Sequence, residues 1–157
     1  MDGLYRGHGR ARAMTRERFA LAVLVAMSAW ACAQSVPAPH AVELGKATCA
    51  KCRQVVSSLD AAAQAVYTDG SVRVYDDLGC MATDPKALHG RAQLYVELAG
   101  GKGWVRVEDI TFASPPGART PQGFNYLAYP EEESRQLAPD HWARGWGDLV
   151  TELARKK

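Results

Sequence analysis

The sequence predicts an α+β fold in which small antiparallel β-hairpins pack against helices. Three observations predict it. The stretch from Ala63 to Tyr75 holds two β-rich runs separated by Asp69-Gly70, a strong hairpin signal because the turn needs a positive φ at glycine. A second pair of β-rich runs flanks the glycine-rich segment 99–103. The residues from Trp146 to Ala154 have the apolar spacing of an amphipathic helix.

The elements between these landmarks follow from local signals. Val72 and Val74 alternate with polar neighbours, which indicates a strand with one buried face. We expect a short helix from about Leu78 to Leu88, ended by Gly90. The second hairpin is predicted to pair 92–98 with 104–113. The intervening glycines form a turn and not a phosphate-binding loop, because no helix follows them.

The last third of the chain is predicted to hold a loop, a strand and two helices. Pro115 and Pro116 mark a loop, and residues 120–129 are expected to form a loop that enters another strand. Pro130 and three following glutamates suit the first turn of a helix, because acidic side chains stabilise the positive end of the helix dipole. In the terminal helix, Leu149, Val150 and Leu153 are expected to face inward.

Composition places the chain among folded globular proteins. It has 157 residues, of which 47% are hydrophobic and 23% charged, and these fractions argue against disorder. Five of its 19 basic residues and two of its 17 acidic residues lie in the first 32 positions. The remaining chain therefore carries 14 basic and 15 acidic residues, a balance that gives no electrostatic footprint for nucleic acid or an anionic membrane surface.

The N-terminal residues predict export. An arginine-rich stretch precedes the apolar run from Phe19 to Ala31, and small residues follow it, which is the pattern of a secretory signal. The run is shorter than the ~20 apolar residues that a membrane-spanning helix needs. We therefore expect residues 1–32 to act as an export signal.

Two processing signals overlap at Cys32. The sequence Ala29-Trp-Ala-Cys32 resembles a bacterial lipobox, in which the cysteine is lipidated and becomes the mature N-terminus. Ala31-Cys32-Ala33 instead fits the pattern cut by ordinary signal peptidase. We favour lipidation of Cys32. Residues 33–44 are then a tether rich in proline and alanine, and 45–157 form the folded domain.

The remaining cysteines carry the candidate chemistry. Cys49-Ala-Lys-Cys52 is a CxxC element, and Cys80-Met81 follows the first hairpin. Thiolates at CxxC spacing can converge on one metal ion, and the hairpin could bring the third thiol and the Met81 thioether beside them. Soft sulfur donors favour Cu(I) over Mg, Ca or Mn and also permit zinc, which is the less favoured ion here. Asp76 and Asp77 are candidate hydrogen-bond partners around the site, with helix capping as their alternative role.

Other interpretations of the cysteines stay open. Exported proteins often contain disulfides, and the residues alone favour a metal site and a disulfide with one leftover thiol equally. A redox-active CxxC pair would make the protein a thiol oxidoreductase, although such a pair usually opens a helix after a strand. Covalent haem is excluded because Arg53 stands where a histidine is required. A structural zinc site would need a fourth ligand, which His89 or His141 could supply. The cysteines could also be inert, in a structural or partner-binding lipoprotein that holds no metal. We find no motif of an enzyme active site.

The order of these motifs resembles the NosL family, the accessory lipoproteins of nitrous oxide reductase maturation. The resemblance rests on the lipobox-like start, on Cys49-Ala-Lys-Cys52 and on Tyr75-Asp-Asp-Leu-Gly-Cys80. It continues through Thr120-Pro-Gln-Gly-Phe124 and the Trp146-Gly-Asp-Leu helix start, and so covers most of the chain from about Thr48 to Glu152.

The resemblance implies a periplasmic, membrane-anchored Cu(I) chaperone that is not an enzyme and that delivers copper to nitrous oxide reductase or its maturation machinery. It also implies a fold similar to the mercury lyase MerB, with two small ββαβ-like halves. The chain departs from the family at two places. Arg53-Gln54 replaces the usual Gly-Met after the second cysteine, and Gln122 replaces the methionine of the TPMG element. These departures put methionine ligation in doubt.

Overall fold

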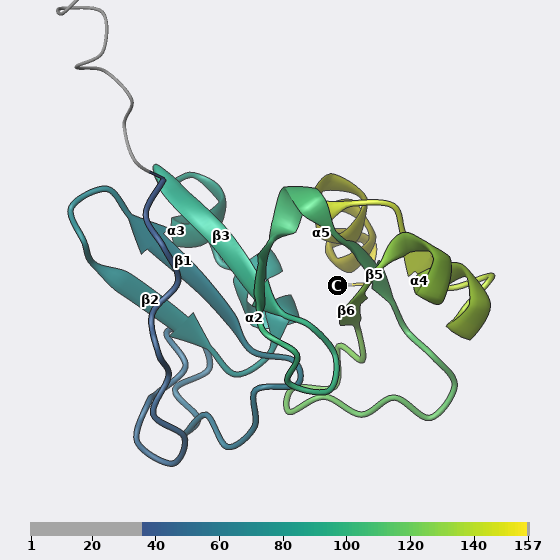
Figure 1. The fold of residues 1–157 in the computed structure, drawn as a ribbon, viewed down its shortest axis with the longest axis horizontal. Coiled ribbons are helices and arrows are strands. Elements are labelled where there is room, and N and C mark those ends of the chain that lie inside the picture. Colours follow the sequence, from purple (N-terminus) through teal and green to yellow (C-terminus); the bar gives the residue numbers. More distant parts are fainter. Residues whose placement is uncertain (1–35, 157) are drawn as a thin grey trace, which may run out of the picture. The chain divides into compact units, whose positions relative to one another are not determined.

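Two small antiparallel sheets and four helices make up the part of the chain that the computed structural model describes, residues 36–156 (Figure 1). The predicted α+β class is confirmed at this level. The predicted export signal and Cys32 lie outside the described residues. The elements are β1 (Ala63–Tyr67), β2 (Val72–Tyr75), α2 (Leu78–Ala82), α3 (Pro85–Leu88), β3 (Ala92–Glu97), β4 (Trp104–Arg106), the 3-10 helix η1 (Val107–Asp109), β5 (Thr111–Ala113), β6 (Leu127–Tyr129), α4 (Glu131–Leu137), β7 (Trp142–Ala143) and α5 (Trp146–Arg155).

The first sheet has the strand order β2-β1-β3-β4 and contains the predicted first hairpin. β1 and β2 pair antiparallel around Asp69 and Gly70, and Gly70 has a φ of 82°. The Asp69 carboxylate also accepts hydrogen bonds from the backbone and the hydroxyl of Ser71, which stabilises the turn. The residues that determine this hairpin are therefore close together in the sequence, which is why it could be predicted.

The prediction of the second hairpin is only partly correct. β3 pairs with β4 as expected, but the second arm ends at Arg106. η1 follows at once, and Arg106 and Asp109 form an ion pair across it. The next residues enter a second sheet, of order β6-β5-β7, because β5 pairs with β6 and with β7 instead of β3. A parallel bridge between Leu98 and Ala128 joins the two sheets.

The prediction of one continuous helix from Leu78 to Leu88 is wrong. The structure divides it into α2 and α3, with Thr83 and Asp84 between them. Asp84 has extended backbone angles, as a residue before proline prefers, and its side chain accepts from the backbone of Lys86. Asp84 thus caps a new helix that begins at Pro85, and the first helix has to end before it.

α2 lies in the middle of the described fold, between the two sheets (Figure 1). It contacts β1 and β2 on one side and α5 on the other. Its five residues are all buried, and Cys80 and Met81 belong to the main apolar cluster. α5 contributes Leu149 and Leu153 to that cluster, as predicted. The first helix after the hairpin therefore forms the centre of the core.

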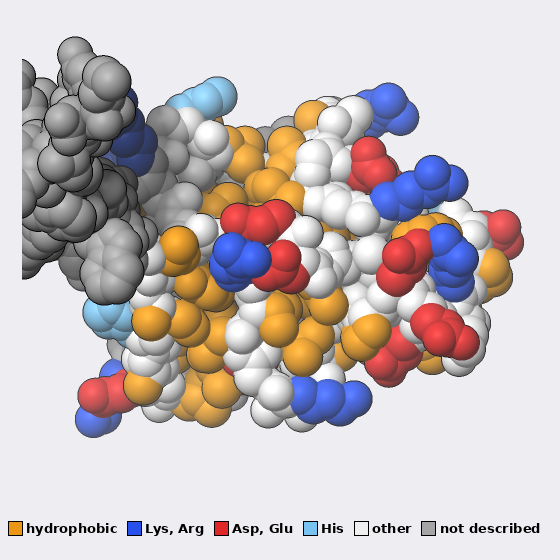
Figure 2. Space-filling model, turned by 45° about the horizontal axis from the view of Figure 1, so that its top comes forward, with side chains coloured by type: hydrophobic (Ala, Val, Ile, Leu, Met, Phe, Trp, Pro, Cys, Tyr) orange, Lys and Arg blue, Asp and Glu red, His pale blue; other side chains and the backbone are white. Residues whose placement is uncertain are grey.

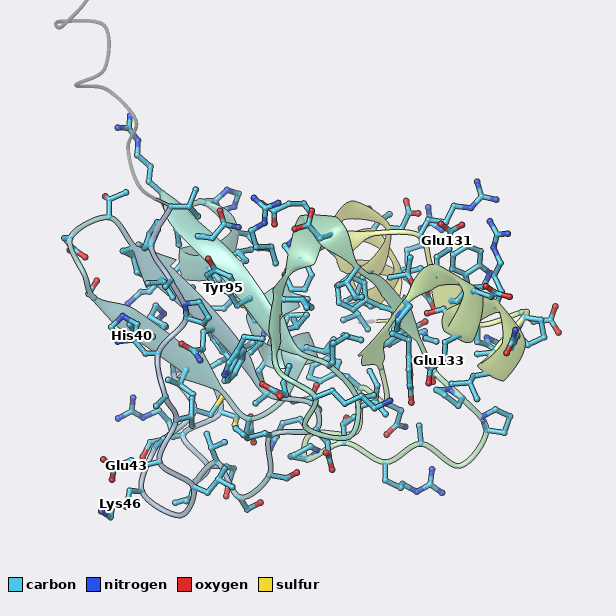
Figure 3. All side chains as sticks on the ribbon, in the orientation of Figure 1. His40, Glu43, Lys46, Tyr95, Glu131 and Glu133 are labelled. Carbon is cyan, nitrogen blue, oxygen red and sulfur yellow. The ribbon has the colours of Figure 1, made fainter. Side chains whose placement is uncertain are left out.

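The N-terminal segment predicted as a tether contacts the first sheet from its first described residues onward. Tyr95 on β3 donates its hydroxyl to the carbonyl of Pro37 (2.7 Å). The buried side chain of Gln64 on β1 accepts from the N–H of His40 and donates to its carbonyl. His40 and Tyr95 are labelled in Figure 3. Farther on, an ion pair between Glu43 and Lys46 closes a turn. Residues 36–46 thus lie along the domain.

The surface of the described part carries both signs of charge. Acidic and basic side chains are intermingled on the face shown in Figure 2, at the end where α4 lies, in keeping with the balanced charge count. Among residues 36–156, none of the helices combines the length and the apolar character needed to cross a bilayer.

Candidate metal centre

The CxxC element forms a tight turn held by its own backbone. Thr48 and Val55 form an antiparallel bridge on either side of it. Within the turn, the Cys49 N–H donates to the carbonyl of Gln54 (2.8 Å), and the Arg53 N–H donates to the carbonyl of Cys49 (3.1 Å). Arg53 has a φ of 68°, in the left-handed region that glycine favours. The turn is therefore a knuckle, and no helix begins at it.

This turn is attached to the strand that leads to the aspartate pair. The backbone N–H of Ala50 donates to the carbonyl of Val74 on β2 (2.7 Å). Asp76 and Asp77 follow β2 directly, and Asp77 caps α2 by accepting from the N–H of Gly79 (2.9 Å). The cap starts the helix that carries Cys80. One backbone contact and one helix cap thus bring the CxxC turn and Cys80 to the same place.

Four side chains meet there. One ligand atom from each of them lies within 4.8 Å of every other: the sulfur atoms of Cys49, Cys52 and Cys80 and a carboxylate oxygen of Asp76. Cys49, Cys80 and Asp76 are at most 2% exposed, and Cys52 is half-buried. All three cysteines are free thiols. This cluster could hold a metal ion.

Two thiols of the cluster, those of Cys52 and Cys80, hold their protons more tightly than an ordinary thiol. Burial, together with the neighbouring Cys49 and Asp76, raises the pKa of Cys52 to about 11, although a backbone hydrogen bond from Gln54 opposes the increase. Burial also raises the pKa of Cys80 well above the ordinary thiol value, and the charges of Cys49 and Cys52 add to the effect. The Cys52 thiol donates to Asp76 (3.3 Å). A metal ion binds thiolates, so it has to displace these protons.

The two aspartates have different surroundings. Asp77 is fully buried, and besides the helix cap its carboxylate accepts from the Thr120 hydroxyl (2.6 Å) and the Gln122 N–H (3.1 Å). Burial raises the pKa of Asp77, although these hydrogen bonds oppose the increase. Asp76 accepts from the Cys52 thiol and from the Gln122 side-chain amide (3.0 Å). Asp77 therefore holds the 120–125 loop, while Asp76 belongs to the cluster.

Not every residue expected at the site is placed among these donors. Met81 is fully buried in the apolar core beside the cysteines, and its ligation stays a prediction. His89 and His141 are exposed and are not among the grouped ligand atoms. The fourth donor near the sulfur atoms is thus the Asp76 carboxylate and not a histidine.

Two residues acquire roles that the sequence did not suggest. Arg53 adopts a left-handed backbone conformation that glycine favours, and Gln122 contacts both aspartates of a motif about 45 positions away. The contact of Arg53 is local to the CxxC turn, whereas those of Gln122 depend on how distant segments pack.

The comparisons with known proteins add no relative. No protein-family model matches the chain, and neither a curated protein nor a solved structure does.

Proposed function

We propose that this protein is an exported Cu(I) carrier, anchored to the membrane by a lipid on Cys32, that resembles NosL and delivers copper for assembly of the nitrous oxide reductase copper centres. In this proposal it is a metallochaperone and not an enzyme. The observation that supports it is the gathering of three free cysteine sulfurs and one carboxylate within 4.8 Å.

The form of the CxxC turn favours metal binding over thiol–disulfide exchange. A reactive redox cysteine needs a lowered pKa, which a helix N-terminus or a nearby cation provides. Here the CxxC residues lie in a knuckle, and burial raises the pKa of Cys52 to about 11. Such a thiol is a poor nucleophile at neutral pH, but a metal ion can still displace its proton.

The donor set favours a soft ion. Three sulfur atoms suit Cu(I), which prefers thiolates to oxygen ligands. Two of the three sulfurs are buried, so that the ion would be shielded from water, while the half-buried Cys52 provides contact with the outside. A carrier needs both features, because it has to retain copper in transit and yield it to a receiving ligand.

A Cu(I) competition titration tests the proposal. The reduced protein is titrated without oxygen against a chelator that reports bound Cu(I), alongside Cys52→Ser and Gln54→Ala. We expect one tightly bound Cu(I) per chain, an affinity lowered more than about tenfold by Cys52→Ser, and no change in Gln54→Ala, which alters an exposed side chain of the same turn. Equal affinity in all three proteins would reject copper binding through this cluster.

A further inference from the structure

The carboxylate of Asp76 is an unusual neighbour for a sulfur cluster. It is 1% exposed, and it accepts hydrogen bonds from two side chains, the Cys52 thiol and the Gln122 amide. Once a metal ion displaces the Cys52 proton, the carboxylate loses that donor and faces a thiolate. A buried carboxylate in this position is stabilised only if the positive charge of the ion lies within its reach.

Gln122 holds this carboxylate from the solvent side. Its backbone N–H is bonded to Asp77, so the residue is fixed at a buried anchor, while its side chain is exposed and reaches Asp76. Gln122 also lines a surface pocket of about 350 Å³ together with Phe124, Asn125 and Lys156. Gln122 therefore contacts Asp76 of the cluster and also lines this surface pocket.

We propose that Asp76, held in place by Gln122, is a fourth donor that lets this cluster bind a four-coordinate divalent ion, Zn²⁺ above all, and that Gln122 thereby tunes the preference of the site between zinc and Cu(I). This inference rests on the proposal that the cysteines bind metal. Gln122 is a positioning residue here, because it acts on the ion through Asp76.

The distance between Cys52 and Asp76 fits a tetrahedral ion. Zinc bonds sulfur at about 2.3 Å and carboxylate oxygen at about 2.0–2.2 Å, so a tetrahedral site places sulfur and oxygen roughly 3.5 Å apart. Cys52 Sγ and Asp76 Oδ1 are 3.3 Å apart in the metal-free cluster. The other ligand atoms, at up to 4.8 Å, have to approach one another by about 1 Å for the sulfur–sulfur separation of roughly 3.8 Å that the same bond lengths imply.

The charges of the four ligands also favour a divalent ion. Three thiolates and a carboxylate carry four negative charges, of which Zn²⁺ offsets two and Cu(I) only one. Because repulsion between buried like charges is large, the carboxylate is better accommodated beside the divalent ion. Cu(I) can be held by sulfur alone, so Asp76 contributes less to its binding.

The test compares two metals in three variants. Zn²⁺ and Cu(I) affinities are measured for the reduced protein, Asp76→Asn, Gln122→Ala and the matched control Gln54→Ala, and the spectrum of bound Co²⁺ reports the coordination of the divalent ion. Removing an outer hydrogen-bond partner of a metal ligand usually lowers affinity 10–100-fold. We expect Gln122→Ala to lower the ratio of Zn²⁺ to Cu(I) affinity by that factor, and Asp76→Asn, which alters the donor itself, to lower it by at least as much. Both variants should alter the Co²⁺ spectrum, and Gln54→Ala should leave the ratio and the spectrum unchanged.

The possible results separate this inference from the proposed function. Wild-type protein that binds Cu(I) but neither Zn²⁺ nor Co²⁺ overturns this inference and leaves the proposed function standing. An unchanged ratio of Zn²⁺ to Cu(I) affinity in both Asp76→Asn and Gln122→Ala does the same. Wild-type protein that binds none of the three ions overturns the inference and the proposed function together. If Asp76→Asn does not fold, Gln122→Ala decides the question, because its side chain is exposed.

Discussion

At the scale of single residues, Arg53 shows how the CxxC turn is held closed. Its backbone lies in the left-handed region, with a φ of 68°, and its N–H bonds to the carbonyl of Cys49. For a residue with a Cβ this conformation costs roughly 1–2 kcal/mol. The turn tolerates this cost because the Thr48–Val55 bridge and the contact of Ala50 with β2 hold it on both sides.

Arg53→Gly is therefore expected to stabilise the metal-free protein. Glycine adopts this φ without strain but loses more backbone entropy on folding, so the net gain in unfolding free energy should be about 0.5–1 kcal/mol. Urea unfolding of the reduced protein measures it. Arg53→Ala is the control, because it removes the same side chain and keeps the strain. A gain of the same size in Arg53→Ala would show that the side chain, and not the backbone, is responsible.

At the scale of elements, the loop from Thr120 to Asn125 is fitted closely to α2. Asp77 joins the two through hydrogen bonds, and Phe124 packs against Gly79, one residue before Cys80. A Cβ at Gly79 would lie 2.1 Å from the Phe124 ring and 2.6 Å from its Cβ. Because these atoms are near the Phe124 backbone, the ring could not simply turn away.

Gly79→Ala should accordingly destabilise the protein by about 1–3 kcal/mol, the usual cost of overpacking a core. Gly147→Ala is the matched control, because a Cβ there meets nothing within 4 Å and the position lies in the long helix α5. That variant should gain up to about 1 kcal/mol. Thermal and urea unfolding of both variants provide the comparison, and a Gly79→Ala protein as stable as wild type would contradict the packing.

The elements also show what a single sequence can predict. The Asp69-Gly70 hairpin and the terminal helix were predicted correctly, because each is determined by a few consecutive residues. The pairing of β5 with β6 and β7 was not predicted, because it joins residues up to about 30 positions apart and β7 has only two residues. The division of the helix at Asp84-Pro85 could have been predicted, because proline restricts the residue before it.

The same distinction applies to the candidate site. CxxC spacing and the predicted export signal made the three cysteines recognisable as a group, and the structure places their sulfurs together. Asp76 was expected beside the site, yet its carboxylate lies among the ligand atoms. The contact of Gln122 with Asp76 depends on the 120–125 loop folding back onto α2, which no local pattern indicates.

At the scale of the whole molecule, buried thiols and tyrosines limit the pH range over which the metal-free protein is stable. Burial raises the pKa of Cys52 to about 11, and it raises the pKa values of Cys80, Tyr75 and Tyr126 in the same direction. The folded protein then holds these protons more tightly than the unfolded chain. Their contribution to stability is complete below the ordinary thiol pKa of 9.0 and is lost as the pH rises through the folded values.

We expect the urea midpoint of the metal-free protein to fall steadily above about pH 9. In Cys52→Ser the decline between about pH 9 and pH 11 should be shallower, because that variant has no thiol at position 52 to ionise. Gln54→Ala should follow the wild type. A midpoint that stays constant over this range, or an equally steep decline in Cys52→Ser, would contradict the raised pKa of Cys52.

The central claim is that one cluster of cysteine sulfurs binds Cu(I), and X-ray absorption at the copper edge tests it most directly. The protein is loaded with one equivalent of Cu(I) without oxygen, and the atoms bound to copper are identified by their scattering. We predict a shell made of sulfur, reduced in sulfur number by Cys52→Ser and unchanged by Gln54→Ala. A shell of nitrogen or oxygen atoms, or a sulfur shell that Cys52→Ser leaves intact, would contradict the claim.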